Sequence, residues 1–223
     1  MQEKIGGIFF DAYGTLFDVA SVARKCRELF GDSAVELTAL WREKQLQFTW
    51  LRSLMDSYTD FEQVTEEALI CACRLLNLVP ESGKIASLMA AYDRLDAFPE
   101  VKAALAGLRE YSLSIVSNGT PAMLAAAVES TGLSGIFAHL ISVDEIKVYK
   151  PSPRVYALAL EKTGLPAAGA AFVSSNAFDA AGSKAYGFRA VWVNRGGKPW
   201  DGPGDRPDIE VRNLSGLGEI VGV

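Results

Sequence analysis

Beyond residue 97, short apolar runs alternate with stretches in which apolar residues recur at helical spacing. This alternation predicts a parallel β-sheet with helices on both faces, because successive parallel strands are joined through helical crossovers. The sequence therefore predicts an α/β fold. We expect strands over 113–117, 137–143, 170–174 and 188–193, helices over 99–110, 121–131, 151–163 and 177–186, and a loop-rich segment over 196–207.

One further apolar run, residues 5–10, stops at Asp11 and is typical of a buried strand. The segment that follows carries no strand pattern, and its apolar residues recur three and four positions apart up to about residue 95. Because the first strand belongs to the same sheet as the later ones, this helical block is an insertion. We predict a Rossmann-like, doubly wound parallel sheet core domain over 1–16 and 97–223, with an inserted helical cap subdomain over 17–96.

Composition narrows the function classes. With 49% hydrophobic residues among 223, the chain can bury a sizeable core. The net charge of −5 and the lack of a dense Lys/Arg cluster argue against a nucleic-acid partner. The apolar runs are too short to cross a bilayer, and the N-terminus lacks the pattern of a signal peptide. We expect a cytoplasmic protein that binds neither nucleic acid nor membrane.

Polar residues directly follow each of the predicted strands. In a doubly wound sheet, ligands bind outside the carboxyl ends of the strands, so these residues are expected to share one edge. Polar strand ends are also common as plain turn residues, and any single one has that explanation. Together they indicate a site of carboxylate, hydroxyl, amide and ammonium groups: Asp11, Ser117-Asn118-Gly119, Asp144 with the loop to Lys150, and Ser174-Ser175-Asn176.

These motifs resemble those of the haloacid dehalogenase superfamily and, within it, the type II L-2-haloacid dehalogenases. Asp-x-x-Gly-Thr-Leu alone marks only the superfamily, which consists mostly of phosphatases, whereas Asp-Ala-Tyr together with Ser-Ser-Asn-x-x-Asp is far more specific. The resemblance covers nearly the whole chain. Its motifs are Asp11-Ala12-Tyr13-Gly14-Thr15-Leu16-Phe17, Leu40–Leu46 in the cap, Ser117-Asn118-Gly119, Lys150-Pro151 and Ser174-Ser175-Asn176-Ala177-Phe178-Asp179.

Tyr13 separates the two chemistries of that superfamily. A magnesium-dependent phosphatase of this pattern carries a second aspartate at this position, and Mg²⁺ needs several oxygen ligands in near-octahedral order. The fourth motif here offers Asn176 and Asp179 in place of paired acids. We therefore expect no metal and no cofactor. A magnesium-dependent phosphatase and a non-catalytic binding protein with the same fold remain the alternatives.

The resemblance implies hydrolysis of short L-2-haloalkanoic acids to D-2-hydroxy acids, releasing halide through an aspartyl-ester intermediate. Asp11 is then the nucleophile, and Lys150 orients it. Asp179 is either the base for ester hydrolysis or a residue that positions Lys150. The remaining residues of this catalytic set are expected to fix Asp11 and the hydrolytic water or to reach back to the site: Thr15, Tyr156, Ser174 and Asn176.

The resemblance also implies residues that contact substrate. Arg42 of the cap is expected to meet the substrate and the departing halide, which Asn118 and Phe178 would cradle. Ser117 and the backbone after it would take the substrate carboxylate, and Ala12 and Tyr13 would line the pocket. A homodimer is expected from the resemblance alone.

Two positions depart from many relatives. Phe178 stands where tryptophan is common, which bears on the width of the pocket. Glu43 stands where an uncharged amide is expected, so that it would either repel anionic substrates at the pocket mouth or bind Arg42.

Overall fold

The computed structural model describes residues 4–218 and contains a six-stranded parallel sheet with the order β3-β2-β1-β4-β5-β6. This is the strand order of a doubly wound Rossmann-type sheet, so the predicted fold class is confirmed. The strands are β1 (Gly7–Phe10), β2 (Ser112–Ser117), β3 (His139–Ser142), β4 (Ala170–Ser174), β5 (Arg189–Val193) and β6 (Ile209–Val211).

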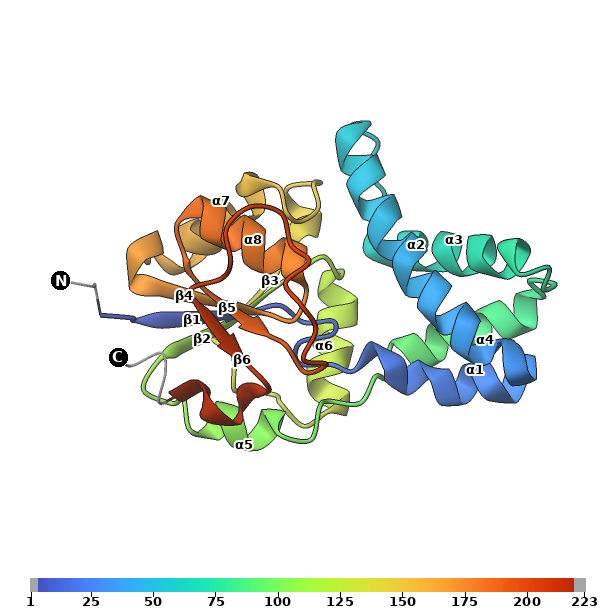
Figure 1. The fold of residues 1–223 in the computed structure, drawn as a ribbon, viewed down its shortest axis with the longest axis horizontal. Helices are drawn as coiled ribbons and strands as arrows, with labels where there is room; N and C mark the ends of the chain where they lie inside the picture. The colour runs from blue at the N-terminus through green and yellow to red at the C-terminus, as the bar shows by residue number, and fades with distance from the viewer. Residues whose placement is uncertain (1–3, 219–223) are drawn as a thin grey trace.

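Helices cover both faces of the sheet. The chain runs outward from β1 through β2 to β3 and then returns to β4 on the other side of β1. Since such crossovers are right-handed, this reversal places the later helices on the opposite face from the earlier ones. Figure 1 shows α7 and α8 above the sheet and α5 below it. The core helices are α5 (Val101–Ala106), α6 (Pro121–Ser130), α7 (Pro153–Thr163) and α8 (Ala177–Tyr186).

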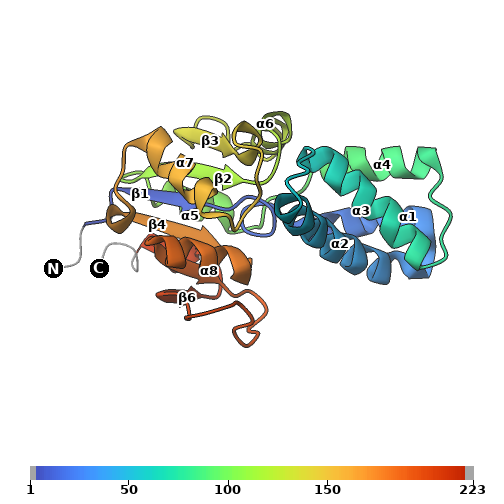
Figure 2. The ribbon, with the colours of Figure 1, turned by 90° about the horizontal axis from the view of Figure 1, so that it is seen from above.

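The segment between β1 and α5 is helical and lies beyond the carboxyl ends of the strands, as Figures 1 and 2 show. Its main helices are α1 (Ala23–Phe30), α2 (Ala34–Leu54), α3 (Phe61–Leu75) and α4 (Ser82–Tyr92). The side chain of Asp60 accepts the Gln63 N–H and thereby caps the start of α3. The indole of Trp41 on α2 donates to the backbone oxygen of Thr65 at 2.8 Å, which fastens α2 to α3. No helix within residues 4–218 is both long and apolar enough to span a membrane.

The ends of some predicted elements differ from the structure. The helix expected over 99–110 is α5, which is shorter. Gly107 is its C-cap residue, and the backbone N–H of Leu108 donates to the carbonyl oxygen of Leu105 at 3.1 Å, which closes a turn in place of a further helical turn. No strand was predicted after residue 207, yet β6 pairs with β5. Three residues carry too little periodicity to be recognised, and β6 depends on its neighbour for its hydrogen bonds.

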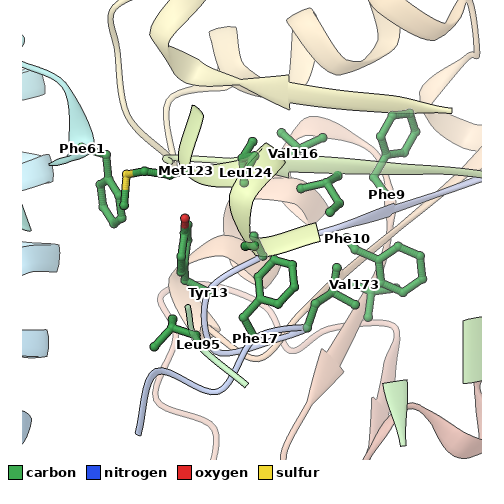
Figure 3. Close-up of a cluster of buried hydrophobic side chains, with 14 of the residues drawn as sticks. Phe9, Phe10, Tyr13, Phe17, Phe61, Leu95, Val116, Met123, Leu124 and Val173 are labelled. Atoms are coloured by element: carbon green, nitrogen blue, oxygen red, sulfur yellow. The ribbon is translucent and has the colours of Figure 1, made fainter. Parts of the chain in front are cut away.

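β1 runs through the centre of the apolar core. Phe10 lies level with Ile115 of β2 and Val173 of β4, and it is fully buried. Figure 3 shows its ring within the cluster of buried side chains that includes Val173. Burying a phenylalanine contributes about 1.5–3 kcal/mol, which holds the register of the strand. Asp11, the next residue, therefore leaves the sheet at the same level as Ser174.

Candidate active site at the carboxyl edge of the sheet

A tight turn follows β1 and brings Thr15 back to Asp11. The carbonyl oxygen of Ala12 accepts the backbone N–H groups of Thr15, Leu16 and Phe17 at 3.2, 2.9 and 3.0 Å. Gly14 has a φ of +93°, a conformation that side-chain-bearing residues rarely adopt. The turn thus explains why position 14 is glycine. Ala12 takes part in the turn through its backbone carbonyl oxygen.

Four donors meet on the carboxylate of Asp11, and they are divided unevenly between its two oxygens. Oδ2 accepts hydrogen bonds from Thr15 Oγ1 at 3.0 Å, Asn176 Nδ2 at 2.7 Å and Ser174 Oγ at 3.3 Å. Oδ1 accepts from the ammonium of Lys150 at 3.0 Å. The carboxylate is nearly buried, so these bonds fix its orientation at the end of β1. Oδ1, with one donor, retains a lone pair for reaction.

Lys150 lies between two carboxylates. Its Nζ is 3.0 Å from Asp11 Oδ1 and 2.7 Å from Asp179 Oδ2, and the residue is only 2% exposed. Burial by itself lowers the pKa of a lysine, but the two carboxylates outweigh it and raise the pKa of Lys150 above its ordinary value. The side chain is therefore a cation that orients Asp11, because a protonated amine has no lone pair with which to attack.

Asp179 accepts a second hydrogen bond, from the hydroxyl of Tyr156. Tyr156 Oη lies 2.7 Å from Asp179 Oδ1, and both residues are fully buried. Burial raises the pKa of Asp179 to about 6, although Lys150 and Tyr156 both stabilise its ionised form. Burial also raises the pKa of Tyr156, so that its hydroxyl remains a donor. The structure thus brings Tyr156 to the site, one turn into α7.

The side chain of Tyr13 packs into an aromatic wall. Its ring stacks on Tyr92 with centroids 5.6 Å apart, and Phe61 lies at the same centroid distance. Figure 3 shows the ring between Leu95 and Phe61. Gly119 is required beside it, because a Cβ there would lie 2.8 Å from a ring carbon of Tyr13.

Arg42 reaches from the cap to the core. Its Nη2 donates to the carbonyl oxygen of Tyr13 at 3.2 Å and to Asn176 Oδ1 at 3.3 Å. Its Nη1 donates to Gln45 Oε1 at 2.7 Å. The alternative in which Glu43 binds Arg42 is wrong, since the Glu43 side chain is 69% exposed and lies 3.7 Å from Lys44.

Gln45 is a further residue at the site, and no role for it was predicted from the sequence. This amide is buried on α2, and its Nε2 donates to Thr65 Oγ1 at 2.7 Å and to Tyr92 Oη at 3.1 Å. A glutamine three residues after Arg42 on one helix was the available signal, because positions i and i+3 share a helix face. Gln45 fixes one side of the Arg42 guanidinium.

Asn118, Ser117 and Phe178, which are expected to bind substrate or halide, each contact another part of the protein. Asn118 accepts the backbone N–H of Lys150 at 3.0 Å, and Ser117 Oγ accepts the N–H of Gly119 at 3.0 Å. Phe178 at the start of α8 meets the ring of Trp50 on α2, with centroids 5.2 Å apart. Trp50, Phe178 and Asn176 line a cleft of about 550 Å³ between cap and core, together with residues such as Leu46 and Arg195.

Asp144 is a predicted strand-end residue that does not join the Asp11 cluster. Its Oδ1 accepts the hydroxyl of Tyr58 at 2.9 Å and the ammonium of Lys147 at 2.7 Å. The ring of Tyr58 stacks on Tyr149, beside Lys150 in the chain, with centroids 5.0 Å apart. This group joins the cap to the core.

The residues around Asp11 lie within the part of the chain that matches a known protein family. Residues 5–187 match the sequence model of the haloacid dehalogenase-like hydrolases. The chain belongs to this hydrolase family. The resemblance inferred from the motifs is therefore confirmed.

Dehalogenases of known sequence are similar to this chain over nearly their full length. An (S)-2-haloacid dehalogenase of Pseudomonas sp. (strain YL) is 47% identical over 221 residues, covering 98% of this chain and 95% of the relative. Haloacetate dehalogenase H-2 of Moraxella sp. (strain B) is 40% identical over 224 residues, covering all of both chains.

Solved structures of L-2-haloacid dehalogenases have the same fold. One crystal structure superimposes with a TM-score of 0.96 at 43% identity and covers 99% of this chain and 100% of its own. The enzyme from Xanthobacter autotrophicus with chloropropionic acid covalently bound has a TM-score of 0.92 at 38% identity, covering 97% of this chain and 98% of its own.

A magnesium ion does not fit the donor set of this family member. The backbone oxygen of Tyr13 accepts hydrogen bonds from Arg42 and Asn176, each at 3.2 Å, and the carboxylates of Asp11 and Asp179 face Lys150. A hard cation needs several oxygen ligands directed at one point, whereas cationic and N–H donors already occupy these oxygens. Within residues 4–218, no group of three or more His, Cys, Asp or Glu side chains is placed to hold a metal ion.

Proposed function

We propose that this protein is an (S)-2-haloacid dehalogenase, a hydrolase acting on carbon–halide bonds. It converts short L-2-haloalkanoic acids into D-2-hydroxy acids and halide, without a metal or other cofactor. The observation that carries the proposal is the carboxylate of Asp11. Its Oδ2 accepts hydrogen bonds from three neutral donors, and its Oδ1 accepts one from Lys150 alone. Such an arrangement suits a nucleophile aimed at carbon, and the full-length dehalogenase relatives support it.

In the first step, Oδ1 of Asp11 attacks C2 of the substrate in line with the carbon–halogen bond. A carbon–oxygen bond forms, halide leaves with the bonding electrons, and C2 inverts. Lys150 and the donors on Oδ2 hold the carboxylate at the required angle. The covalent chloropropionate complex of the Xanthobacter enzyme supports an ester intermediate of this kind.

In the second step, water attacks the ester carbonyl carbon of Asp11 and releases the 2-hydroxy acid. The former Oδ2 is now the carbonyl oxygen, and negative charge develops on it. Thr15, Ser174 and Asn176 are already placed around that atom, so they act as an oxyanion hole without rearrangement. C2 takes no part in this step, which leaves it inverted once.

Asp179 is the base that takes the proton from the hydrolytic water. Its raised pKa makes it a better proton acceptor than an ordinary aspartate, and Tyr156 holds its second oxygen at 2.7 Å. Its contact with Lys150 also supports the positioning role, and both tasks use one carboxylate.

Substrate binds between core and cap. Residues 17–96 form the cap subdomain, residues 1–16 and 97–223 form the core domain, and Arg42 is the cap group that meets the substrate and halide. Ser117 and the following backbone take the substrate carboxylate at the start of α6, where helix N–H groups favour an anion. Asn118 and Phe178 receive the halide, Ala12 and Tyr13 line the pocket, and Trp50 narrows it against Phe178.

Two further expectations belong to this proposal. The protein acts in the cytoplasm, and it forms a homodimer. Two exposed apolar side chains lie at the end of α2, its last residue Leu54, 81% exposed, and the C-cap residue Met55, 61% exposed, and such groups favour a protein–protein contact.

Halide release from the two enantiomers of 2-chloropropionate, with EDTA present, tests the function. We expect release from the L-enantiomer alone, at a rate unchanged by the chelator. A protein that releases no halide, and whose phosphatase activity is abolished by EDTA and restored by magnesium, would support the phosphatase alternative instead. Binding without turnover would support a non-catalytic protein.

A single turnover with enzyme in excess in oxygen-18 water tests the ester pathway. Because water attacks the carbonyl carbon of Asp11, label should enter the peptide that contains Asp11. Label found only in the product would exclude the ester intermediate.

A further inference from the structure

Arg195 holds the backbone of the loop that carries the nucleophile. It follows β5 at the carboxyl edge of the sheet, and its guanidinium spans two chain segments of the site. Nη1 donates to the carbonyl oxygen of Gly14 at 3.2 Å and to Ser175 Oγ at 2.9 Å. Nη2 donates to the carbonyl oxygen of Thr15 at 3.0 Å. One side chain thus fastens the turn after β1 to the segment after β4.

The guanidinium of Arg195 is itself fixed by two further residues, Glu100 and Phe98. Glu100 Oε1 accepts from Nη2 at 2.7 Å and from Nε at 3.2 Å. The central carbon of the guanidinium lies over the ring of Phe98, 3.6 Å from the ring centroid. Both partners lie just after the point where the chain returns from the cap. Only a planar fork with several N–H groups can serve all of these contacts at once.

Arg195 reaches Asp11 through Thr15 and Ser175. The backbone N–H of Ser175 donates to Thr15 Oγ1 at 2.8 Å, and this hydroxyl in turn donates to Asp11 Oδ2 at 3.0 Å. The hydroxyl is oriented because it accepts one bond and donates the other. Arg195 fixes the backbone on both sides of this relay: Gly14 and Thr15 on one side, Ser175 on the other.

We propose that Arg195 is a positioning residue that sets the attack geometry of Asp11 through the Thr15–Ser175 relay. The role rests on the proposed dehalogenase function, and it lies outside the residues that the motifs of the family brought to notice. Arg195 also lines the cleft, at the edge of the substrate space. Misplacing a reacting group by about 1 Å costs roughly 100-fold in rate. Loosening the relay therefore slows chemistry more than it weakens substrate binding.

Arg195→Lys and Arg195→Met test the proposal, with Arg109→Met as the matched control at an exposed arginine. Lysine keeps the charge but cannot bridge both carbonyls and Ser175, so kcat should fall about 10-fold or more while KM changes less than about threefold. The methionine variant should lose more, and the control should match the parent. Rates are taken per folded molecule, from circular dichroism at the assay temperature.

A purely structural arginine would behave differently. It would lower the melting temperature while leaving kcat per folded molecule within about twofold of the parent, and this outcome overturns the proposal. If the methionine variant does not fold, the lysine variant decides.

A crystal structure of Arg195→Lys gives a readout that needs no turnover. The contact between Thr15 Oγ1 and Asp11 Oδ2 should be lengthened or lost, and an unchanged contact contradicts the positioning role. Should the parent protein release no halide, the dehalogenase function fails, while this structural comparison still decides the role of Arg195.

Discussion

The hydroxyl of Tyr156 donates a 2.7 Å hydrogen bond to Oδ1 of Asp179, in a site that excludes water from both groups. Because the proposed base must be ionised and burial raises its pKa to about 6, kcat should fall as the pH drops below about 6. Tyr156 stabilises the ionised form, so its removal raises the pKa further. In Tyr156→Phe, the acid limb of kcat for halide release should therefore move to higher pH.

Tyr111→Phe is the control for that shift, because Tyr111 lies outside the site. An acid limb that stays in place in Tyr156→Phe would show that Asp179 does not govern it. The positioning role of Asp179 towards Lys150 would then be favoured over the base.

Asp11→Asn should abolish turnover and retain the fold. The amide has the shape of the carboxylate but is too weak a nucleophile to displace halide, and loss of a nucleophile costs roughly 10⁴-fold or more. Steady-state chloride release measures the loss, and circular dichroism checks the fold. Asp205→Asn, at an exposed aspartate, serves as the control. Undiminished chloride release would remove Asp11 from the mechanism.

Asn176→Ala should slow ester hydrolysis more than ester formation. Asn176 donates to Oδ2 at 2.7 Å, and that oxygen loses negative charge as the ester forms but gains a full negative charge when water attacks the ester. Loss of one oxyanion-hole donor costs roughly 10²–10³-fold in kcat. Rapid mixing should therefore show a burst of halide equal to the enzyme concentration, followed by slow release. Slow release without a burst, when Gln47→Ala behaves like the parent, would place the effect in the first step.

Replacing Leu54 and Met55 with glutamate should yield monomers if the end of α2 is the dimer contact. Both side chains are largely exposed, and a charge on each partner would oppose an apolar contact. Sedimentation equilibrium measures the mass of the parent and of the variant. A parent that sediments as a monomer contradicts the homodimer, and a variant that stays dimeric places the contact elsewhere.

The sequence predicted the parts of the site that follow directly from strands. Asp11 directly follows β1 and Ser174 ends the neighbouring strand β4 at the same level, so an apolar run followed by a polar residue was sufficient to bring them together. The same rule included Asp144, whose carboxylate contacts the cap instead. A strand end defines an edge of the sheet, but it does not define the direction in which a side chain points.

Other features depended on contacts that no local pattern encodes. Arg195 acts on carbonyl groups of Gly14 and Thr15, and a carbonyl has no signature in the sequence. The partner of Arg42 also depended on helix geometry, since Arg42 and Gln45 share a face of α2 while the side chain of Glu43 is exposed to solvent.

The donors that surround Asp11 come from distant parts of the chain, and this has a consequence for folding. Asn176 and Lys150 are separated from Asp11 by 165 and 139 residues. Contacts of such long range form only after large loops have closed, at a high cost in chain entropy. A nascent chain that has not yet released β4 from the ribosome has no Ser174 or Asn176 at the nucleophile and is therefore inactive. Recovery of halide release after dilution from denaturant would thus report completion of the central sheet, rather than the earlier formation of helices.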